Sequence, residues 1–320
     1  MESAHNYVRK RAMADLKEKK GSLKQFEPAA FIGKEFGNIT LMSMIGKGAM
    51  GAVFIGFQKS LKRKVAVKLF PKALPESTTM KLRFRDEAET VAVLNHPNII
   101  PVYDMGETED LLYIIMQLIE GEDLRAFIHR HQLHPVPSKR VVPLKTGLTL
   151  MLPILDALRF AHNDGVIHRD IKPANVIIDT KQNRPFLADF GIASTQHSEN
   201  DTTDTILGTP LYIAPEQAWG HHVDNRADIY SAGLVLYELA AGKLPLSKKT
   251  LAEVIRLKMY SPELLFSCSP SAANPQIDKT LEDIILRAIE PEVDKRYQNC
   301  TIFIDELTAY LNDNFTGVSS

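Results

Sequence analysis

The order of hydrophobic and polar residues divides the chain into three parts. From residue 36 to about residue 118, short segments rich in Val, Ile and Phe alternate with glycine or charged turns, a pattern typical of β-strands. After Gly121 the apolar residues recur at helical spacing over longer segments. Residues 1–35 are polar and carry eight Lys/Arg against five Asp/Glu. We expect this first part to be a mobile or loosely docked extension.

The second part predicts a small antiparallel sheet with one helix. The helix covers 75–96, where Pro75 and Ser77 open it and Pro97 follows its end. The predicted strands are 38–46, 51–58, 62–70, 98–107 and 111–119.

The third part predicts a larger, mainly helical unit with two short strands. The predicted helices are 122–133, 145–164, 225–241, 249–259, 279–289 and 301–312, and the strands are 175–179 and 185–190. The fold class is therefore α+β with two lobes, 36–118 and 119–314, followed by a tail at 315–320. The polar segment 194–205 has almost no apolar residue and is expected to be a mobile surface loop.

Composition narrows the class of protein. The 320 residues are 44% apolar and carry a formal net charge of −1, so general binding to nucleic acid is not expected. Apolar runs stay far short of the ~20 residues of a membrane-spanning helix. Cys268 and Cys300 lie far apart and predict free thiols in a reducing compartment. We expect a cytoplasmic protein, or the cytosolic portion of a longer membrane-anchored receptor.

Gly46, Gly48 and Gly51 spell G-x-G-x-x-G, a pattern shared by two unrelated nucleotide sites. In the dinucleotide site the loop opens a helix that holds the pyrophosphate, and an acidic residue follows ~20 residues later. Here the segment after Gly51 is AVFIGF, which predicts a strand, and Lys68 stands near the expected acid. Both departures favour a glycine hairpin that closes over phosphates.

Four further motifs follow in a fixed order. They are VAVK at 65–68, HRDIKPAN at 168–175, DFG at 189–191 and APE at 214–216. Together with the glycine loop they resemble the protein kinase family over roughly residues 36–312. The resemblance is strongest to bacterial, eukaryotic-like serine/threonine kinases, as the segments GTPLYIAPEQ and DNRADIYSAGLVLYEL and the pair Lys172-Pro173 indicate. The resemblance implies a bilobal kinase fold and ATP- and Mg²⁺-dependent phosphoryl transfer, with Mn²⁺ as an alternative ion.

The resemblance also assigns roles at the reaction centre. Asp170 would be the catalytic base or orient the substrate hydroxyl, and Lys172 would stabilise the transferred phosphate. Asn175 and Asp189 would hold the metal ion. Ile171 replaces the commoner Leu of this motif, a conservative change.

Lys68 would bind the α/β-phosphates and needs a carboxylate partner. On the predicted helix Glu87 falls inside the apolar stripe of Phe84, Ala88, Val91 and Leu94, whereas Asp86 and Glu89 point away from it. A carboxylate in an apolar stripe is costly unless it is paired. We therefore predict a Lys68–Glu87 ion pair, in agreement with the family motif.

By resemblance the adenine lies between Ile45, Val53, Ala66 and Ile177, with Met116 as gatekeeper. The full set of predicted ATP-binding residues is Ile45, Gly46, Lys47, Gly48, Ala49, Met50, Gly51, Ala52, Val53, Ala66, Lys68, Met116, Gln117, Leu118 and Ile177. Glu216 and Arg296 resemble the buried ion pair that pins the activation segment, and Asp228 resembles the acid that anchors the catalytic loop. His129, His131 and His134 form HxHxxH, but the first two point apart on a helix and predict no metal site.

Regulation is expected in the segment between Asp189 and Glu216. Arg169 could pair with a phosphate there, and Thr209 in GTP is typical of serine/threonine kinases. Thr202, Thr203 and Thr205 are the candidate phosphate acceptors. Autophosphorylation between copies would imply a transient homodimer, and other partners would be protein substrates.

Two rival functions remain to be weighed. A pseudokinase scaffold would lack a catalytic residue, but Lys68, Asp170, Asn175 and Asp189 are all present. A small-molecule kinase would typically lack the GTP…APE peptide-docking segment, which this chain has.

Overall fold

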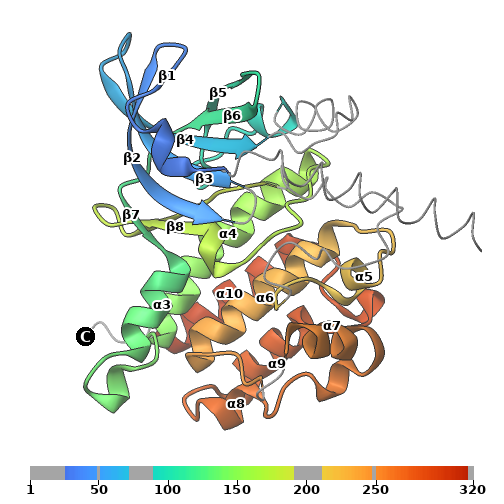
Figure 1. Ribbon diagram of the computed structural model, residues 1–320. Coiled ribbons are helices and arrows are strands. Elements are labelled where there is room, and N and C mark those ends of the chain that lie inside the picture. Colours follow the sequence, from blue (N-terminus) through green and yellow to red (C-terminus); the bar gives the residue numbers. More distant parts are fainter. Residues whose placement is uncertain (1–25, 49–50, 72–88, 191–210, 247–249, 316–320) are drawn as a thin grey trace, which may run out of the picture.

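The computed structural model describes residues 26–48, 51–71, 89–190, 211–246 and 250–315. It has two lobes: a sheet lobe, at the top of Figure 1, and a helical lobe below it. The predicted α+β fold with two lobes is confirmed.

The sheet lobe contains a six-stranded antiparallel sheet in the order β1-β2-β3-β4-β6-β5. Its strands are β1 (Glu35–Phe36), β2 (Ile39–Gly48), β3 (Gly51–Gln58), β4 (Arg63–Pro71), β5 (Val102–Glu107) and β6 (Leu111–Met116). Phe54, Val65 and Val67 are fully buried and form its core with residues of the neighbouring strands. All five strands predicted for this lobe are present, because Val, Ile and Phe fill the apolar face of the sheet.

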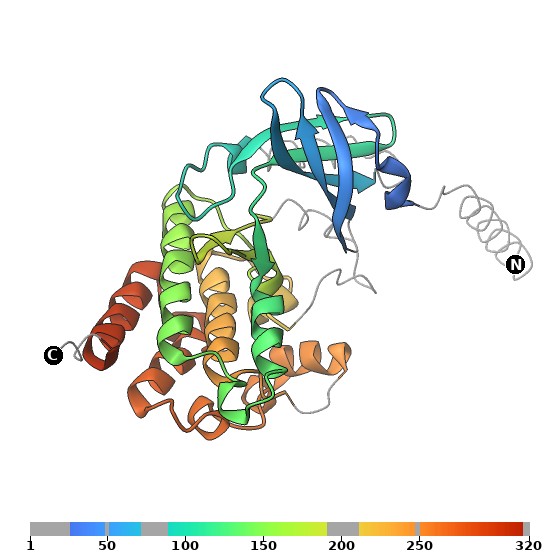
Figure 2. The same cartoon turned by 90° about the vertical axis from the view of Figure 1, so that its left-hand side faces the viewer.

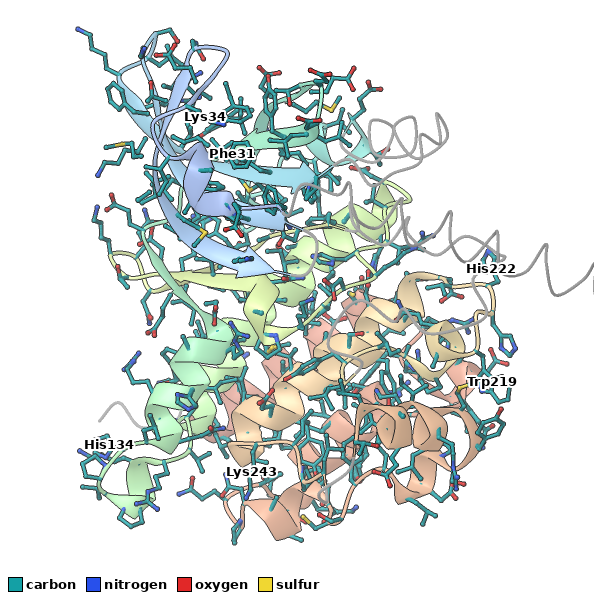
Figure 3. The ribbon with its side chains drawn as sticks, in the orientation of Figure 1. Phe31, Lys34, His134, Trp219, His222 and Lys243 are labelled. Carbon is teal, nitrogen blue, oxygen red and sulfur yellow. The ribbon has the colours of Figure 1, made fainter. Side chains whose placement is uncertain are left out.

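The residues just before the sheet pack onto it. The 3-10 helix η1 (Pro28–Phe31) places Phe31 6.4 Å from Phe36, whose ring lies edge-on to Tyr113 at 5.4 Å. Lys34 covers the Phe31 ring at 4.6 Å, and both residues are labelled in Figure 3. Phe26, Phe31 and Phe36 thus hold the residues just before β2 against the sheet. The rest of the predicted extension, 1–25, lies outside the described residues.

The segment between β4 and β5 of the sheet lobe contacts the helical lobe. Of the predicted helix 75–96, the structure describes 89 onward, and 89–92 are helical. Ile100 donates its N–H to the Leu187 carbonyl at 2.9 Å, and Leu187 donates to Asn98 at 2.7 Å. These two hydrogen bonds tie the end of this segment to the helical lobe.

The helical lobe is built around three long helices that run beside one another (Figure 2). They are α4 (Leu144–Asn163), α6 (Asn225–Ala241) and α10 (Cys300–Phe315). The other helices are α3 (Leu124–Gln132), α5 (Pro215–Ala218), α7 (Leu251–Tyr260), α8 (Pro270–Ala273) and α9 (Lys279–Ala288). The 3-10 helices are η2 (Pro137–Lys139), η3 (Pro173–Asn175), η5 (Pro262–Leu264) and η6 (Val293–Lys295). A three-stranded sheet, β7 (Gly121–Asp123), β8 (Val176–Asp179) and β9 (Arg184–Leu187), lies at the junction with the sheet lobe.

The helix α6 is the central helix of this lobe, since fourteen of its seventeen residues are buried. The Asp224 side chain caps its N-terminus by accepting from the Arg226 N–H, and Gly242 ends it in the left-handed conformation at φ +82°. Because α6 is buried on all sides, its few polar side chains must find partners inside the lobe.

Among the described residues, one helical stretch, Pro137–Asn163, is long and apolar enough by length and composition to cross a membrane. It contains α4, whose buried residues lie in the core of the helical lobe against α6 and α10. That packing is typical of the core helix of a globular domain.

Candidate active site

The glycine loop is a hairpin between β2 and β3. Gly46 pairs with Val53 and Lys47 with Ala52. The strand β3 begins at Gly51, so the dinucleotide interpretation, which requires a helix there, is excluded. A Cβ on Gly51 would lie 1.9 Å from the Leu69 carbonyl oxygen, so no larger residue fits. Among the described residues, no atom lies within 4 Å of a Cβ built on Gly46 or Gly48.

The predicted adenine-binding residues lie on four strands of the sheet lobe and one strand of the helical lobe. Ile45 on β2 is 52% exposed, and Val53 on β3 is half-buried. Ala66 on β4 pairs directly with Met116 on β6, while Ile177 comes from β8 in the other lobe.

The predicted hinge begins at Gln117, whose N–H already donates to the Pro101 carbonyl at 3.0 Å. Its N–H is therefore engaged within the protein. A pocket behind Met116 adjoins this region. It is lined by Lys68, Val91, Ile100, Val102, Ile114, Met116, Leu187, Asp189 and Phe190.

Lys68 and Asp189 form an ion pair across the two lobes. The Lys68 Nζ lies 2.7 Å from the Asp189 Oδ1, and both side chains keep part of their surface exposed. Burial alone would raise the pKa of Asp189, but the Lys68 ammonium, with His168 and Lys172, lowers it below the ordinary value of a carboxyl. The predicted partner of Lys68, Glu87, lies outside the described residues, so that pair stays a prediction.

Asp170 sits at the centre of a hydrogen-bonded cluster. The Lys172 ammonium donates to both its carboxylate oxygens, at 2.9 and 2.7 Å. Asn175 donates its Nδ2 to the Asp170 carbonyl at 2.8 Å and to Oδ2 at 2.9 Å. The structure thus brings together the three side chains that HRDxxxxN spaces over six residues, and η3 supplies the tight turn between them.

The backbone before Asp170 is held by a buried carboxylate. Asp228 on α6, 1% exposed, accepts the His168 N–H at 2.7 Å and the Arg169 N–H at 2.8 Å. It also accepts from His162 Nε2 at 2.8 Å. Arg169 has φ +65°, an uncommon conformation for a non-glycine residue, and these bonds hold it there.

The ion pair Glu216–Arg296 is buried. The guanidinium donates to the two carboxylate oxygens at 2.9 and 3.3 Å and to the Arg226 carbonyl at 2.7 Å. Arg296 is 1% exposed and lies 4.9 Å from the Tyr230 ring centroid. Such a pair is strongly destabilising to break, because either partner alone would be an uncompensated buried charge.

The segment before α5 carries anchors that the sequence alone did not indicate. We call residues 211–217 the anchored segment. Ser231 Oγ donates to the Tyr212 carbonyl at 2.8 Å, and the Tyr212 hydroxyl donates to Glu238. Gln217 accepts from Ala214 N–H at 3.0 Å and donates to the Arg169 carbonyl at 3.0 Å.

These partners were missed because each is a polar residue in a helix whose contact is distant in sequence. The signal that could have indicated Ser231 and Glu238 is a polar side chain inside an otherwise apolar helix, 227–241. Burial raises the pKa of the Glu238 carboxyl above its ordinary value.

The other predicted residues divide into two groups. His131 Nδ1 contacts the Phe127 carbonyl at 3.0 Å, and His134 accepts from the Val136 N–H at 3.1 Å, so each has a local structural partner. The second group lies outside the described residues and consists of Ala49, Met50, Glu87, Thr202, Thr203, Thr205 and Thr209.

The fold combines a sheet lobe and a helical lobe. The site combines a glycine hairpin, a Lys–Asp pair and an Asp–Lys–Asn cluster. Together they define a phosphotransferase of the kinase class. The family model for the protein kinase domain matches residues 39–308. The chain therefore belongs to the protein kinase domain family.

Curated relatives are named serine/threonine-protein kinases. PrkC of Bacillus subtilis is 36% identical over 83% of this chain, and Pkn1 of Myxococcus xanthus is 33% identical over 88%. The chain spans about 40% of the length of these relatives. Among solved structures, the kinase domain of Mycobacterium tuberculosis PknI is similar at a TM-score of 0.68 and 30% identity, covering 88% of this chain and 97% of that one.

Proposed function

We propose that this chain transfers the γ-phosphate of ATP to serine or threonine hydroxyls of proteins. The observation that carries the proposal is the cluster of Asp170, Lys172 and Asn175, whose Lys172 acts electrostatically on Asp189 of the Lys68–Asp189 pair. Phosphoryl transfer relies on positioning and charge stabilisation, and these are the groups that it requires.

Each side chain has a role that its geometry supports. Asp170 orients the substrate hydroxyl and accepts its proton as the oxygen attacks the γ-phosphorus. The bond from the γ-phosphorus to the oxygen that bridges it to the β-phosphorus breaks, and ADP leaves. Lys172, already bonded to Asp170, stabilises the negative charge of the transferred group. Lys68 binds the α/β-phosphates, and the open space above Gly46 and Gly48 lets the hairpin backbone approach them.

The donor set fits a magnesium ion, or manganese in its place. Asn175 donates its Nδ2 to Asp170, which leaves the amide oxygen Oδ1 as the atom to bind a cation. Asp189 adds a carboxylate whose lowered pKa keeps it ionised at neutral pH. Hard cations prefer such oxygen ligands. The ion would neutralise charge on the phosphates.

The pseudokinase alternative has less support, because the catalytic side chains are present and hydrogen-bonded to one another. The anchored segment, held to α6, supports a protein substrate over a small molecule. We further propose autophosphorylation at Thr202, Thr203 or Thr205 within a transient homodimer. Arg169 would pair with the new phosphate and so order the segment that carries it. The free thiols Cys268 and Cys300 support a cytoplasmic location for this domain.

A radiolabelled ATP assay on a generic protein substrate and on the chain itself tests the proposal. The wild type should incorporate phosphate in the presence of Mg²⁺, and Asp170→Ala should not. Equal incorporation by the two would refute the assigned mechanism. Mass spectrometry of peptides from 193–209 tests the phosphorylation sites, and only unmodified peptides from an active enzyme would exclude them.

A further inference from the structure

A buried lysine on α7 contacts the anchored segment. Lys258 lies on α7, whose two buried residues are Val254 and Lys258, one helical turn apart. The lysine is 1% exposed, although the residues around it on the helix are partly or fully exposed. A charged side chain at an inward position normally costs stability unless it forms specific bonds.

The ammonium of Lys258 is directed at backbone. It donates to the Ile213 carbonyl at 2.7 Å and lies 3.5 Å from the Tyr230 hydroxyl, over whose ring it sits at 4.7 Å from the centroid. No carboxylate lies within ion-pair distance among the described residues. The charged groups that act on it electrostatically are Glu216 on α5, already bonded to Arg296, and Arg296 itself. Glu263 on η5 is exposed.

The Ile213 carbonyl belongs to the middle of the anchored segment. Tyr212 on one side is held by Ser231 of α6, and Ala214 on the other by Gln217, which also bonds the Arg169 carbonyl next to Asp170. The bond from Lys258 is thus the one described contact by which a charged side chain of α7 fixes this backbone.

A second bond connects α7 to the same region. Trp219, just after α5, donates its indole N–H to the Met259 carbonyl at 3.1 Å and stacks on His221. Figure 3 shows Trp219 and His222 at the outer surface beside α5. The end of α7 therefore contacts the anchored segment at Ile213 and, just beyond that segment, Trp219 after α5.

From these contacts we infer that Lys258 is a positioning residue for the protein substrate: through the Ile213 carbonyl it holds the anchored segment in the position that accepts the hydroxyl-bearing peptide. The inference rests on the proposed kinase function. An apolar side chain would fill the space beside Val254 with less desolvation cost, so the lysine is accounted for by the bond that its Nζ donates to the Ile213 carbonyl.

The experiment compares Lys258→Met with Lys258→Arg and with Arg256→Met, an exposed matched control on the same helix. Hydrogen exchange of residues 211–217 is the readout that needs no activity. Losing the hydrogen bond to the Ile213 carbonyl should speed exchange there about tenfold in Lys258→Met. Arg256→Met should exchange as the wild type does.

The kinetic readout separates positioning from general damage. In Lys258→Met the KM for the protein substrate should rise about tenfold, while the KM for ATP and the rate of ATP hydrolysis by water stay unchanged. Lys258→Arg, which keeps a charged donor, should recover most of the KM. Unchanged exchange and unchanged protein KM in Lys258→Met would overturn the inference.

The two proposals fail in distinguishable ways. A wild type that transfers no phosphate refutes the kinase function, whereas unchanged exchange at 211–217 refutes the role of Lys258 alone. Should Lys258→Met not fold, Lys258→Arg decides: wild-type exchange and protein KM support the inference, and a loss equal in the KM values for ATP and protein overturns it.

Discussion

Two ion pairs hold the functional region, and they differ in burial and in the number of their bonds. Lys68–Asp189 is a single contact whose side chains are 17% and 32% exposed. Glu216–Arg296 has side chains 10% and 0% exposed, and Arg296 also bonds three backbone carbonyls. Lys68 and Asp189, which we propose to bind phosphate and metal, remain partly exposed. Glu216 and Arg296, which bond each other and, through Arg296, backbone carbonyls, are buried. The comparison separates reacting charges from anchoring charges.

Removing the reacting carboxylate should break activity without breaking the fold. In Asp189→Asn we expect phosphate transfer to fall at least about 10³-fold, because the neutral amide loses charge attraction for both metal and Lys68. The melting temperature should change by less than about 2 °C, since a partly exposed pair contributes little to stability. Steady-state kinetics and calorimetry measure the two effects. A large loss of melting temperature would place this pair among the anchors instead.

Removing the anchoring arginine should give the opposite result. In Arg296→Met we expect unfolding to become easier by about 3–5 kcal/mol, because Glu216 is left as a buried, unpaired charge. Denaturant unfolding measures it. The double variant Glu216→Leu/Arg296→Met is the control, and it should recover part of that loss because both charges are gone. Equal destabilisation in the single and double variants would contradict this account.

The third carboxylate, Asp228, sharpens the comparison because it anchors the backbone beside the reacting Asp170. Asp228→Asn keeps the volume but replaces one of two acceptor oxygens with an NH₂ donor, so one of the bonds from His168, Arg169 or His162 is lost. We expect unfolding to become easier by about 1–3 kcal/mol and kcat to fall more than the KM for ATP. Proportional changes in kcat and the KM for ATP would show that the loop is not specifically affected.

The division between reacting and anchoring residues also separates what the sequence could predict from what it could not. The strands and long helices were predictable because periodicity records which face is buried, and Lys68, Asp170, Asn175 and Asp189 because their motifs are local. The docking of η1 depends on Phe31 meeting Phe36 across a turn, which no periodicity records. The partners of the anchored segment are also tertiary: Lys258 reaches a carbonyl 45 residues away. A lysine within an amphipathic helix gives no sign in the sequence that it points inward.

The smallest effect is expected at Lys258. It is a charged residue in an anchoring position, and among the described residues it has no carboxylate partner. Burial lowers its pKa from 10.5 to about 7; Glu216 opposes this shift and Arg296 adds to it. Between pH 7 and 10.5 the unfolded chain therefore binds a proton at this residue that the folded chain releases, and stability rises with pH in this window. Below pH 7 the folded lysine is charged and the cost of burying it is fully present.

The measurement is the difference in unfolding free energy between the wild type and Lys258→Met, at pH 6.5 and 8.5. Because methionine does not titrate, the wild type should gain about 1–2 kcal/mol relative to the variant as the pH rises between these values. Arg256→Met, whose lost charge is exposed, should show no such gain. A difference that is flat with pH would mean that the buried ammonium keeps its proton as the unfolded lysine does. Lys258 would then behave as Arg296 does, as a buried charge that its bonds stabilise. A carboxylate partner would not be needed for a charge to act as an anchor.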